Sequence, residues 1–337
     1  MLFGFRCGAL VGLLDSLEVK GLVLRNRIVM PPMQTGLATV KGAVTERLVN
    51  FYVRRCAALG LLVVEHSYVS LGGRLSLKQL GIYDDELISG LEKLAGCVHS
   101  KGTPAVVQIT HAGRVAVRDL IGGESAGPSA IGNARELTRN EIDALVDDFA
   151  SAAERAVKAG FDGVELHGAH GFLLNQFFSP LANKRGDDYG GSLENRMRFP
   201  LMVVKRVRET VDRGLLLYRL GADDLDENGT RIEDAVAFAE RLEQNGVDII
   251  DVSGGLCGSE PKQLRGVKGY FVPQAGAIKK VVHVPVIGVG GITEAAYADS
   301  LVREGSVDLV AVGRSLYKDP KWAESAVKAL AGKHDAR

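Results

Sequence analysis

Short, uninterrupted apolar runs recur along the chain and predict eight buried β-strands. Runs of this kind are typical of parallel sheets that are covered on both faces. They are Arg27–Met30, Leu61–Val64, Ala105–Ile109, Gly163–Leu166, Leu215–Leu220, Val247–Val252, Val284–Val289 and Asp308–Val312. A segment with helical periodicity follows each run, and the clearest of these are Thr138–Ala159, Glu194–Val211 and Arg231–Asn245. The pattern therefore predicts a chain in which strands and helices alternate.

Local signals predict where these helices begin and end. Thr138 and Glu141 have the spacing of a capping box, which marks the start of a helix. Three helices run into the next strand through a glycine, at Gly160, Gly246 and Gly305. Glycine suits the left-handed conformation that often ends a helix, so these positions indicate direct helix-to-strand junctions.

Eight strand–helix units without a linker between them predict an α/β fold, a single (β/α)8 TIM barrel. We expect this barrel to span residues 13–337, after an N-terminal extension at residues 1–12. The alternative is an open doubly wound sheet, which would ordinarily carry a G-x-G-x-x-G at its first turn; the sequence has none there. Residues 113–137 follow the third strand with Gly and Pro signals and weak periodicity, so we expect a lid over the barrel mouth.

Composition and charge limit the partners that the protein can have. The 337 residues include 41 Lys and Arg against 41 Asp and Glu, so the basic excess of a nucleic-acid binder is missing. The apolar stretch at residues 1–14 is interrupted by Arg6 and is too short to cross a bilayer. It also lacks the features of a signal peptide. The four cysteines contain no C-x-x-C pair, which fits a reducing compartment. We expect a cytoplasmic protein without nucleic-acid or membrane partners, and homo-oligomerisation stays open.

Glycine turns at the ends of the last two strands are candidates for anion binding. In (β/α)8 barrels the active site lies at the C-terminal strand ends. The seventh strand ends in Gly290 and Gly291, and the eighth in Gly313 followed by Arg314. Such turns let backbone N–H groups approach a phosphate, and an arginine adds a two-pronged contact. The alternative is that the glycines serve only tight turns.

Two polar side chains are expected to point into the barrel mouth from the middle strands. They are Gln108 on the third strand and Arg219 on the fifth. Arg219 has no obvious acidic neighbour in the sequence, which predicts an anionic ligand. A structural ion pair with Asp223 or Asp224 is the alternative.

An H-x-x-H pair, His167 and His170, follows the fourth strand. Two histidines at this spacing can ligate a metal, anchor a carbonyl oxygen, or form a structural pair. A catalytic zinc needs a third ligand, and the sequence indicates none. From the residues alone, we predict a barrel enzyme that binds a phosphorylated ligand beside two histidines.

Several stretches of the chain resemble one family of barrel enzymes. They read LRNRIVMPPM at residues 24–33, QITHAGR at 108–114 and HGAHGFLLNQFFSPLANKRGDDYGGSLENRMRF at 167–199, and VGR at 312–314 adds a short match. The sequence resembles the Old Yellow Enzyme family of FMN-dependent ene-reductases over about residues 13–322. This resemblance implies FMN in the barrel mouth, NADPH or NADH as hydride donor, and an α,β-unsaturated carbonyl compound as substrate.

The resemblance also implies roles for residues. The flavin edge would lie along the backbone of residues 31–34, the pyrimidine side at Gln108, and N1 and O2 near Arg219. The histidine pair would bind the substrate carbonyl. The implied cofactor contacts are Pro31, Pro32, Met33, Gln34, His66, Gln108, Arg219, Gly290, Gly291, Gly313 and Arg314, and the implied catalytic residues are His167, His170 and Arg219; no metal ligand is implied.

The sequence departs from the family pattern at three positions. Gln34 stands where many relatives carry Thr or Cys, and His66 where a small residue usually lies against the flavin. Phe172 replaces the tyrosine that normally protonates the substrate, and a phenyl ring has no proton to give. The donor would then be Tyr68, Tyr270, His66 or solvent, and the sequence does not choose among them.

Two other functions stay open at the level of sequence. One is a metal-dependent lyase or aldolase on the same barrel, with His167 and His170 as ligands. The other is a flavin-binding protein without ene-reductase turnover, which Phe172 suggests. A visible spectrum of the purified protein separates the first from a flavoenzyme.

Overall fold

The eight predicted strands form a closed parallel barrel in the computed structural model, which describes residues 11–334. Each strand pairs with its neighbour along the chain, and the last pairs with the first. The strands are β3 (Ile28–Met30), β4 (Leu61–Tyr68), β5 (Ala105–Thr110), β8 (Gly163–Gly168), β9 (Leu215–Gly221), β10 (Ile249–Ser253), β11 (Val286–Gly288) and β12 (Leu309–Ala311). The TIM-barrel prediction is confirmed. The predicted extension at residues 1–12 lies almost wholly outside the described residues, and the domain bounds stay a prediction.

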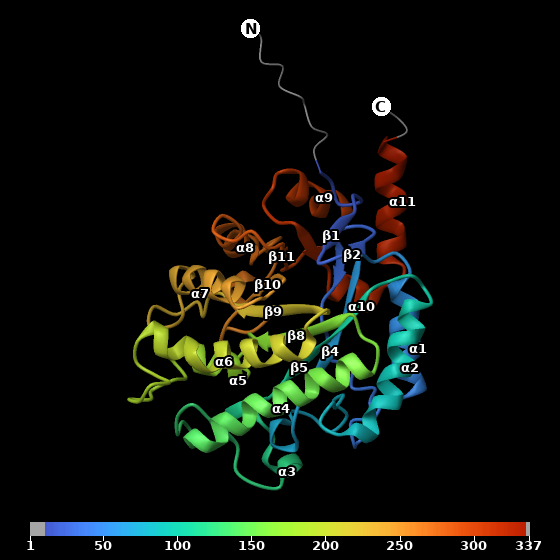
Figure 1. Ribbon diagram of the computed structural model, residues 1–337. Coiled ribbons are helices and arrows are strands. Elements are labelled where there is room, and N and C mark those ends of the chain that lie inside the picture. Colours follow the sequence, from blue (N-terminus) through green and yellow to red (C-terminus); the bar gives the residue numbers. More distant parts are fainter. Residues whose placement is uncertain (1–10, 335–337) are drawn as a thin grey trace.

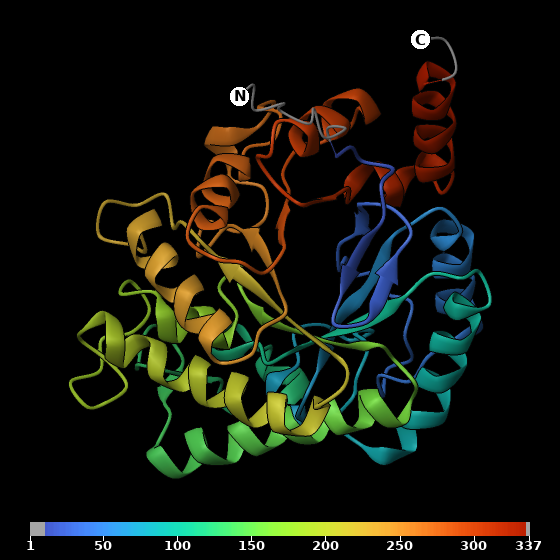
Figure 2. The ribbon, with the colours of Figure 1, turned by 45° about the horizontal axis from the view of Figure 1, so that its top comes forward.

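Helices surround the barrel (Figures 1 and 2). The longer ones are α1 (Glu46–Cys56), α2 (Ile88–His99), α4 (Arg139–Lys158), α6 (Leu193–Val211), α7 (Ile232–Gln244), α8 (Val272–Lys279), α9 (Ala295–Arg303) and α11 (Trp322–His334). The shorter ones are α3 (Arg118–Ile121), α5 (Leu173–Phe178) and α10 (Arg314–Lys318), with 3-10 turns at Leu71–Gly73, Asp85–Leu87, Gly113–Val115 and Lys262–Leu264. No helix among residues 11–334 combines the length and the apolar character needed to cross a membrane.

The predicted helix boundaries are present in the structure. The Thr138 hydroxyl accepts a hydrogen bond from the backbone of Glu141, and the Glu141 carboxylate accepts one from Thr138 N, which completes the capping box. Gly160, Gly246 and Gly305 have φ of +78°, +89° and +72°. This left-handed conformation is costly for residues with a Cβ, so glycine allows the chain to turn at once into the next strand.

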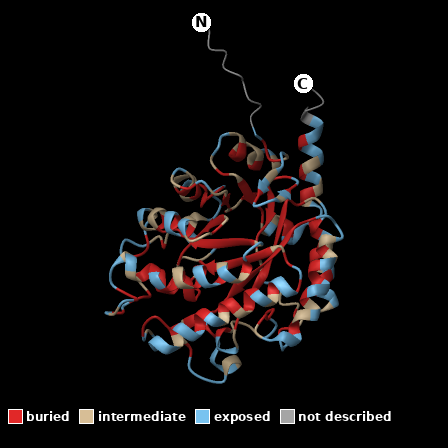
Figure 3. Ribbon diagram, viewed as in Figure 1, coloured by how far each residue is buried: buried red, intermediate tan, exposed pale blue. Residues whose placement is uncertain are grey.

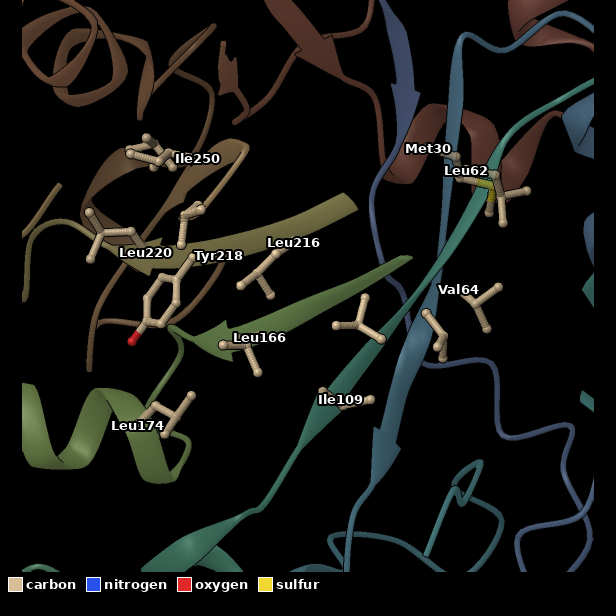
Figure 4. Packing of buried hydrophobic residues seen from close by; sticks show 14 of the residues in the cluster. Met30, Leu62, Val64, Ile109, Leu166, Leu174, Leu216, Tyr218, Leu220 and Ile250 are labelled. Carbon is tan, nitrogen blue, oxygen red and sulfur yellow. The ribbon is translucent and has the colours of Figure 1, made fainter. Parts of the chain in front are cut away.

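Successive side chains of each strand point to opposite faces of the sheet and so contribute to two different apolar layers. One face of each strand packs against the helices, with residues such as Val64, Leu166 and Tyr218 (Figure 4). The other face fills the barrel interior, with residues such as Val63 and Leu217. Figure 3 shows that the barrel strands are buried throughout while the outer faces of the helices are exposed. The core therefore consists of two clusters, one between the strands and the helices and one inside the barrel.

A hairpin of β1 (Leu17–Val19) and β2 (Leu22–Leu24) precedes the barrel. Lys20 and Gly21 form its turn with φ of +51° and +82°, as the tight two-residue turn of a twisted hairpin requires. Its buried residues Val19 and Leu24 belong to the same apolar cluster as the inner faces of the strands. The hairpin therefore closes the N-terminal end of the barrel, a feature that the strand pattern does not predict.

The predicted lid segment, residues 113–137, has little regular structure. It contains α3 and two short paired strands, β6 (Ala126–Gly127) and β7 (Arg135–Glu136). It packs against α5, where the Gln176 amide oxygen accepts a hydrogen bond from Arg114 N. None of its residues lines the cavity described below. Its function as a lid stays a prediction.

Candidate active site

A cavity of about 750 Å³ lies at the C-terminal ends of the strands. Every site residue predicted from the sequence lines it, although these residues come from seven of the eight strands or the loops that follow them. They are Pro31, Pro32, Met33, Gln34, His66, Gln108, His167, His170, Arg219, Gly290, Gly291, Gly313 and Arg314. The structure therefore brings the whole predicted set together at the place where this fold puts active sites.

Arg219 lines the cavity and has an acidic partner that the sequence analysis missed. Its Nε is 3.4 Å from Oδ2 of Asp251, directly across the β9–β10 pair, and both side chains are almost fully buried. The expectation of an arginine without an acidic neighbour is wrong, and so is the alternative pairing with Asp223 or Asp224. Asp223 instead accepts a hydrogen bond from the backbone N–H of Leu225, and Asp224 accepts one from the backbone N–H of Thr230.

The guanidinium of Arg219 is nevertheless available to a ligand. Its two Nη atoms have no hydrogen-bond partner within residues 11–334, and they are accessible from the cavity. Nε also lacks a hydrogen bond of acceptable geometry to Asp251. A buried cation with unused donors is expensive, which indicates that something in the cavity satisfies it.

A second buried carboxyl group orients Gln108. The Gln108 Nε2 donates to Oε1 of Glu165 at 2.8 Å, directly across the β5–β8 pair. Burial raises the pKa of Glu165 well above its usual value, nearby Asp251 adds to this, and Arg219 opposes it. With Nε2 held by Glu165, the rest of the Gln108 amide can face the cavity.

Three histidines and one phenylalanine line one side of the cavity. The rings of His167 and His170 lie 5.1 Å apart and nearly perpendicular, and His66 lies 6.1 Å from His167. The ring of Phe172 contacts both His167, at 4.3 Å, and His66, at 5.3 Å. Burial lowers the pKa of all three histidines, to about 4 for His66 and well below the usual value for the other two. They are therefore neutral at pH 7.

The position of His170 depends on a strained backbone. Its φ is +59°, which is uncommon for a residue with a side chain. The conformation is held by its N–H, which donates to Gly254 O at 3.1 Å, and by a 2.7 Å hydrogen bond between Nε2 and the Ser253 hydroxyl. Strain of this kind often marks a functional site, because the surroundings must over-determine it.

The glycine turns after β11 and β12 expose backbone to another part of the cavity. Gly290 and Gly291 have φ of +117° and +62°. A Cβ on Gly290 would lie 2.7 Å from the Tyr270 ring, and one on Gly313 would lie 3.0 Å from the sulfur of Met33. Gly290 therefore requires glycine, Gly313 has little room for a side chain, and both open the backbone to a ligand.

Arg314 contributes positive charge at this end but is paired in the structure. It forms an ion pair with Glu260 of the loop between β10 and α8 and also reaches the Tyr270 hydroxyl at 3.4 Å. Both partners of the ion pair are about half exposed, so the pair contributes little to stability. A phosphate could replace Glu260 at small cost.

Sequence reasoning missed several residues of the site. Glu165 and Asp251 are polar residues inside apolar strands, two positions before His167 and Ser253, so strand alternation could have placed them in the interior. The loop between β10 and α8 carried no motif. Phe172 and Tyr270, both named in the sequence analysis, also line the cavity. The remaining lining residues are Leu75, Ser253, Ser259, Glu260, Arg265, Gly266, Val267, Lys268, Val289, Ile292, Thr293, Ala311, Ser315 and Lys318.

Glu65 supports the loop that carries Pro31–Gln34. Its carboxyl oxygens accept hydrogen bonds from the backbone N–H of Thr35 at 2.9 Å and from the Thr35 hydroxyl at 2.6 Å. Burial raises the pKa of Glu65 from 4.5 to about 7, although these hydrogen bonds oppose the shift. Near neutral pH the carboxyl group is therefore only partly ionised.

This raised pKa predicts how Glu65→Gln changes stability with pH. A folded-state pKa above the unfolded value means that ionisation opposes folding, so the cost is absent below pH 4.5, grows toward pH 7 and is then constant. The amide avoids this cost, which is at most about 3 kcal/mol at 1.36 kcal/mol per pKa unit. We expect Glu65→Gln to melt above the wild type at pH 8, with a smaller difference at pH 5. Equal differences at both pH values would contradict this account.

Among residues 11–334, no three His, Cys, Asp or Glu side chains are placed to hold a metal ion. His167 and His170 therefore have no third ligand of these types within that part of the chain. His170 also shares its Nε2 with Ser253.

The chain matches the model of one protein family over residues 13–333, described as the NADH:flavin oxidoreductase / NADH oxidase family. It is 39% identical to an NADPH dehydrogenase from Geobacillus thermodenitrificans (strain NG80-2), over 96% of both chains. It is 43% identical to an NADH oxidase from Thermoanaerobacter brockii, over 92% of this chain but 50% of that protein, so it spans about half of that relative's length.

A solved structure agrees with these relatives. An old yellow enzyme homologue from Zymomonas mobilis superposes with a TM-score of 0.84 and 26% identity, over 95% of this chain and 93% of its own. The resemblance to the Old Yellow Enzyme family is confirmed. The chain belongs to the NADH:flavin oxidoreductase / NADH oxidase family.

Proposed function

We propose that the protein is an FMN-dependent oxidoreductase that uses NADH or NADPH to reduce the activated C=C bond of an α,β-unsaturated carbonyl compound. FMN is the cofactor that membership of this family implies. The observation that carries the proposal is the convergence of Arg219, the histidine pair and the glycine turns on one cavity.

The residues of the cavity fit FMN. Arg219, with unused donors, and Gln108, held by Glu165, are suited to the polar edge of the flavin ring. The backbone at Gly290, Gly291 and Gly313, together with Arg314, is suited to the phosphate. When bound, FMN accepts a hydride from NADH or NADPH and passes it to the substrate.

The chain's own residues would hold and polarise the substrate. Neutral His167 and His170 are hydrogen-bond donors that can bind a carbonyl oxygen, which becomes more negative as the double bond is reduced. Fixed donors cost little reorganisation at that moment, and the Ser253 contact and the backbone conformation already hold His170 in place. Pro31–Gln34 and Phe172 also line the cavity and would contact the bound ligand.

The test begins with the visible spectrum of the purified protein. We expect non-covalently bound FMN, released by heat, then anaerobic bleaching by NADH or NADPH and recovery of the colour with an activated enone. A colourless protein, or a released cofactor that proves to be FAD, would contradict the FMN assignment. A yellow protein that NAD(P)H does not bleach would instead be a flavin binder without turnover.

A further inference from the structure

Reduction of a C=C bond needs a proton as well as a hydride, and the donor has to lie close to the histidine pair that would bind the carbonyl oxygen. Phe172 has no exchangeable proton. The Tyr270 hydroxyl donates to Ser259 O at 2.7 Å, and Tyr68 does not line the cavity, its hydroxyl donating to Lys41 O at 3.2 Å. The proposed function already uses His167 and His170 for the carbonyl oxygen. His66 is the remaining histidine of the cavity.

A β-bulge turns His66 toward the cavity. The pairing of β4 with β5 shifts between Val64 and Ser67, so Glu65 and His66 together stand opposite Gln108. Val64, two positions earlier, packs against the helices. Strict alternation would send His66 to that same outer layer, but the bulge breaks the alternation and the ring lines the cavity.

Hydrogen bonds fix which ring nitrogen of His66 carries the proton. The backbone N–H of Leu75 donates to Gln79 Oε1 at 2.8 Å, and this contact determines the orientation of the Gln79 amide. Gln79 Nε2 therefore faces His66 Nδ1, at 2.9 Å. An amide nitrogen only donates, so Nδ1 must accept and the proton of the neutral ring lies on Nε2.

The protonated nitrogen is the one left for a ligand. Nε2 of His66 has no hydrogen-bond partner within residues 11–334. This atom is not fully buried, and it is therefore accessible from the cavity that the ring lines. The rings of His66, His167 and Phe172 are mutual neighbours, and Phe172 contacts both histidines. A substrate whose carbonyl oxygen is bound by the histidine pair would therefore lie beside His66.

We propose that His66 donates the proton that completes alkene reduction, with Gln79 as the positioning residue that keeps this proton on Nε2. This rests on the proposed function. After hydride forms the C–H bond at Cβ, the π electrons move toward Cα and the carbonyl oxygen. The electron pair at Cα then takes the Nε2 proton and leaves the ring as an imidazolate, to whose Nδ1 Gln79 donates. Water entering the cavity reprotonates Nε2 and leaves as hydroxide.

The first test separates the two half-reactions of His66→Phe by stopped flow on the FMN-loaded protein. Positioned proton donors typically contribute about 10²–10⁴-fold, so we expect enone-dependent reoxidation to slow by about a hundredfold or more, with flavin reduction little changed. Tyr68→Phe is the matched control and should behave as wild type. Reoxidation of His66→Phe within about threefold of wild type would overturn the proposal.

Two further readouts do not depend on rate. With an α-methyl enone in D₂O, the wild type should deliver deuterium to one face of Cα, and His66→Phe should lose this selectivity. In ¹⁵N-histidine NMR of the wild-type holoenzyme, His66 should show a protonated Nε2 and a bare Nδ1. A protonated Nδ1 would overturn the assignment even if His66→Phe fails to fold. A wild type that NAD(P)H reduces but enones never reoxidise would instead refute the proposed function itself.

Discussion

Replacing Arg219 with methionine is expected to slow reduction of the bound flavin by NAD(P)H by about 10²–10³-fold. Negative charge builds up on the ring when it is reduced, and a fixed, buried donor to such charge is worth about 3 kcal/mol by analogy with oxyanion contacts. Arg219 is 4% exposed, so water would not replace the lost charge well. The reduction potential should fall as well, and it is measured by equilibration with a reference dye.

A control for Arg219→Met has to account for the loss of stability that Asp251 would cause. Without Arg219 its carboxylate would be buried without a counter-charge, and breaking such a pair typically costs about 3–5 kcal/mol of stability. Arg219→Met should therefore also be compared with Arg219→Met combined with Asp251→Asn, which removes this cost. Arg219→Lys keeps the charge and should retain most of the potential. If Arg219→Met lost FMN affinity but kept its potential, the residue would be only a binding contact.

His167→Ala is expected to lower the rate of enone-dependent reoxidation by about 10²–10³-fold. Losing one fixed donor to a developing oxyanion typically has an effect of this size. Reduction by NAD(P)H should change less, because it creates no charge on a carbonyl oxygen. Transient kinetics over a range of enone concentrations separates the loss of binding from the loss of rate.

The matched control for this prediction is His167→Asn, which restores a neutral hydrogen-bond donor at the same place. Because burial lowers the pKa of His167 well below its usual value, the donor is the neutral ring. An amide should therefore rescue much of the rate between pH 6 and pH 8. If His167→Ala and His167→Asn were equally slow, the role of the residue as a simple donor would be refuted.

Most of the barrel could be predicted because its strands are buried on both sides. A buried parallel strand needs apolar residues at almost every position, so the runs stood out, and polar residues at their ends pointed to the site. Gln108 and Arg219 were identifiable for this reason. Glycines such as Gly160 marked junctions because only they adopt the required conformation cheaply. The resemblance to a family then implied specific roles for the glycine turns and the histidine pair.

The rest depended on which strands became neighbours and in what register. Arg219 and Asp251 are 32 positions apart, and only the pairing of β9 with β10 makes them a pair. The bulge that turns His66 inward has no signature in the residues of β4 itself. Whether Arg314 meets Glu260 depends on the path of a long loop. Such contacts arise from tertiary structure, and a single sequence does not encode them locally.

The hairpin of β1 and β2 has a consequence for the steady-state kinetics. Since it closes one end of the barrel, the proposed enzyme would receive the dinucleotide and the enone through the same mouth, and we expect them to compete for the reacting centre. Turnover of the proposed enzyme would then be ping-pong. Double-reciprocal plots at several enone concentrations would give parallel lines, and excess enone would compete with NAD(P)H for the oxidised protein.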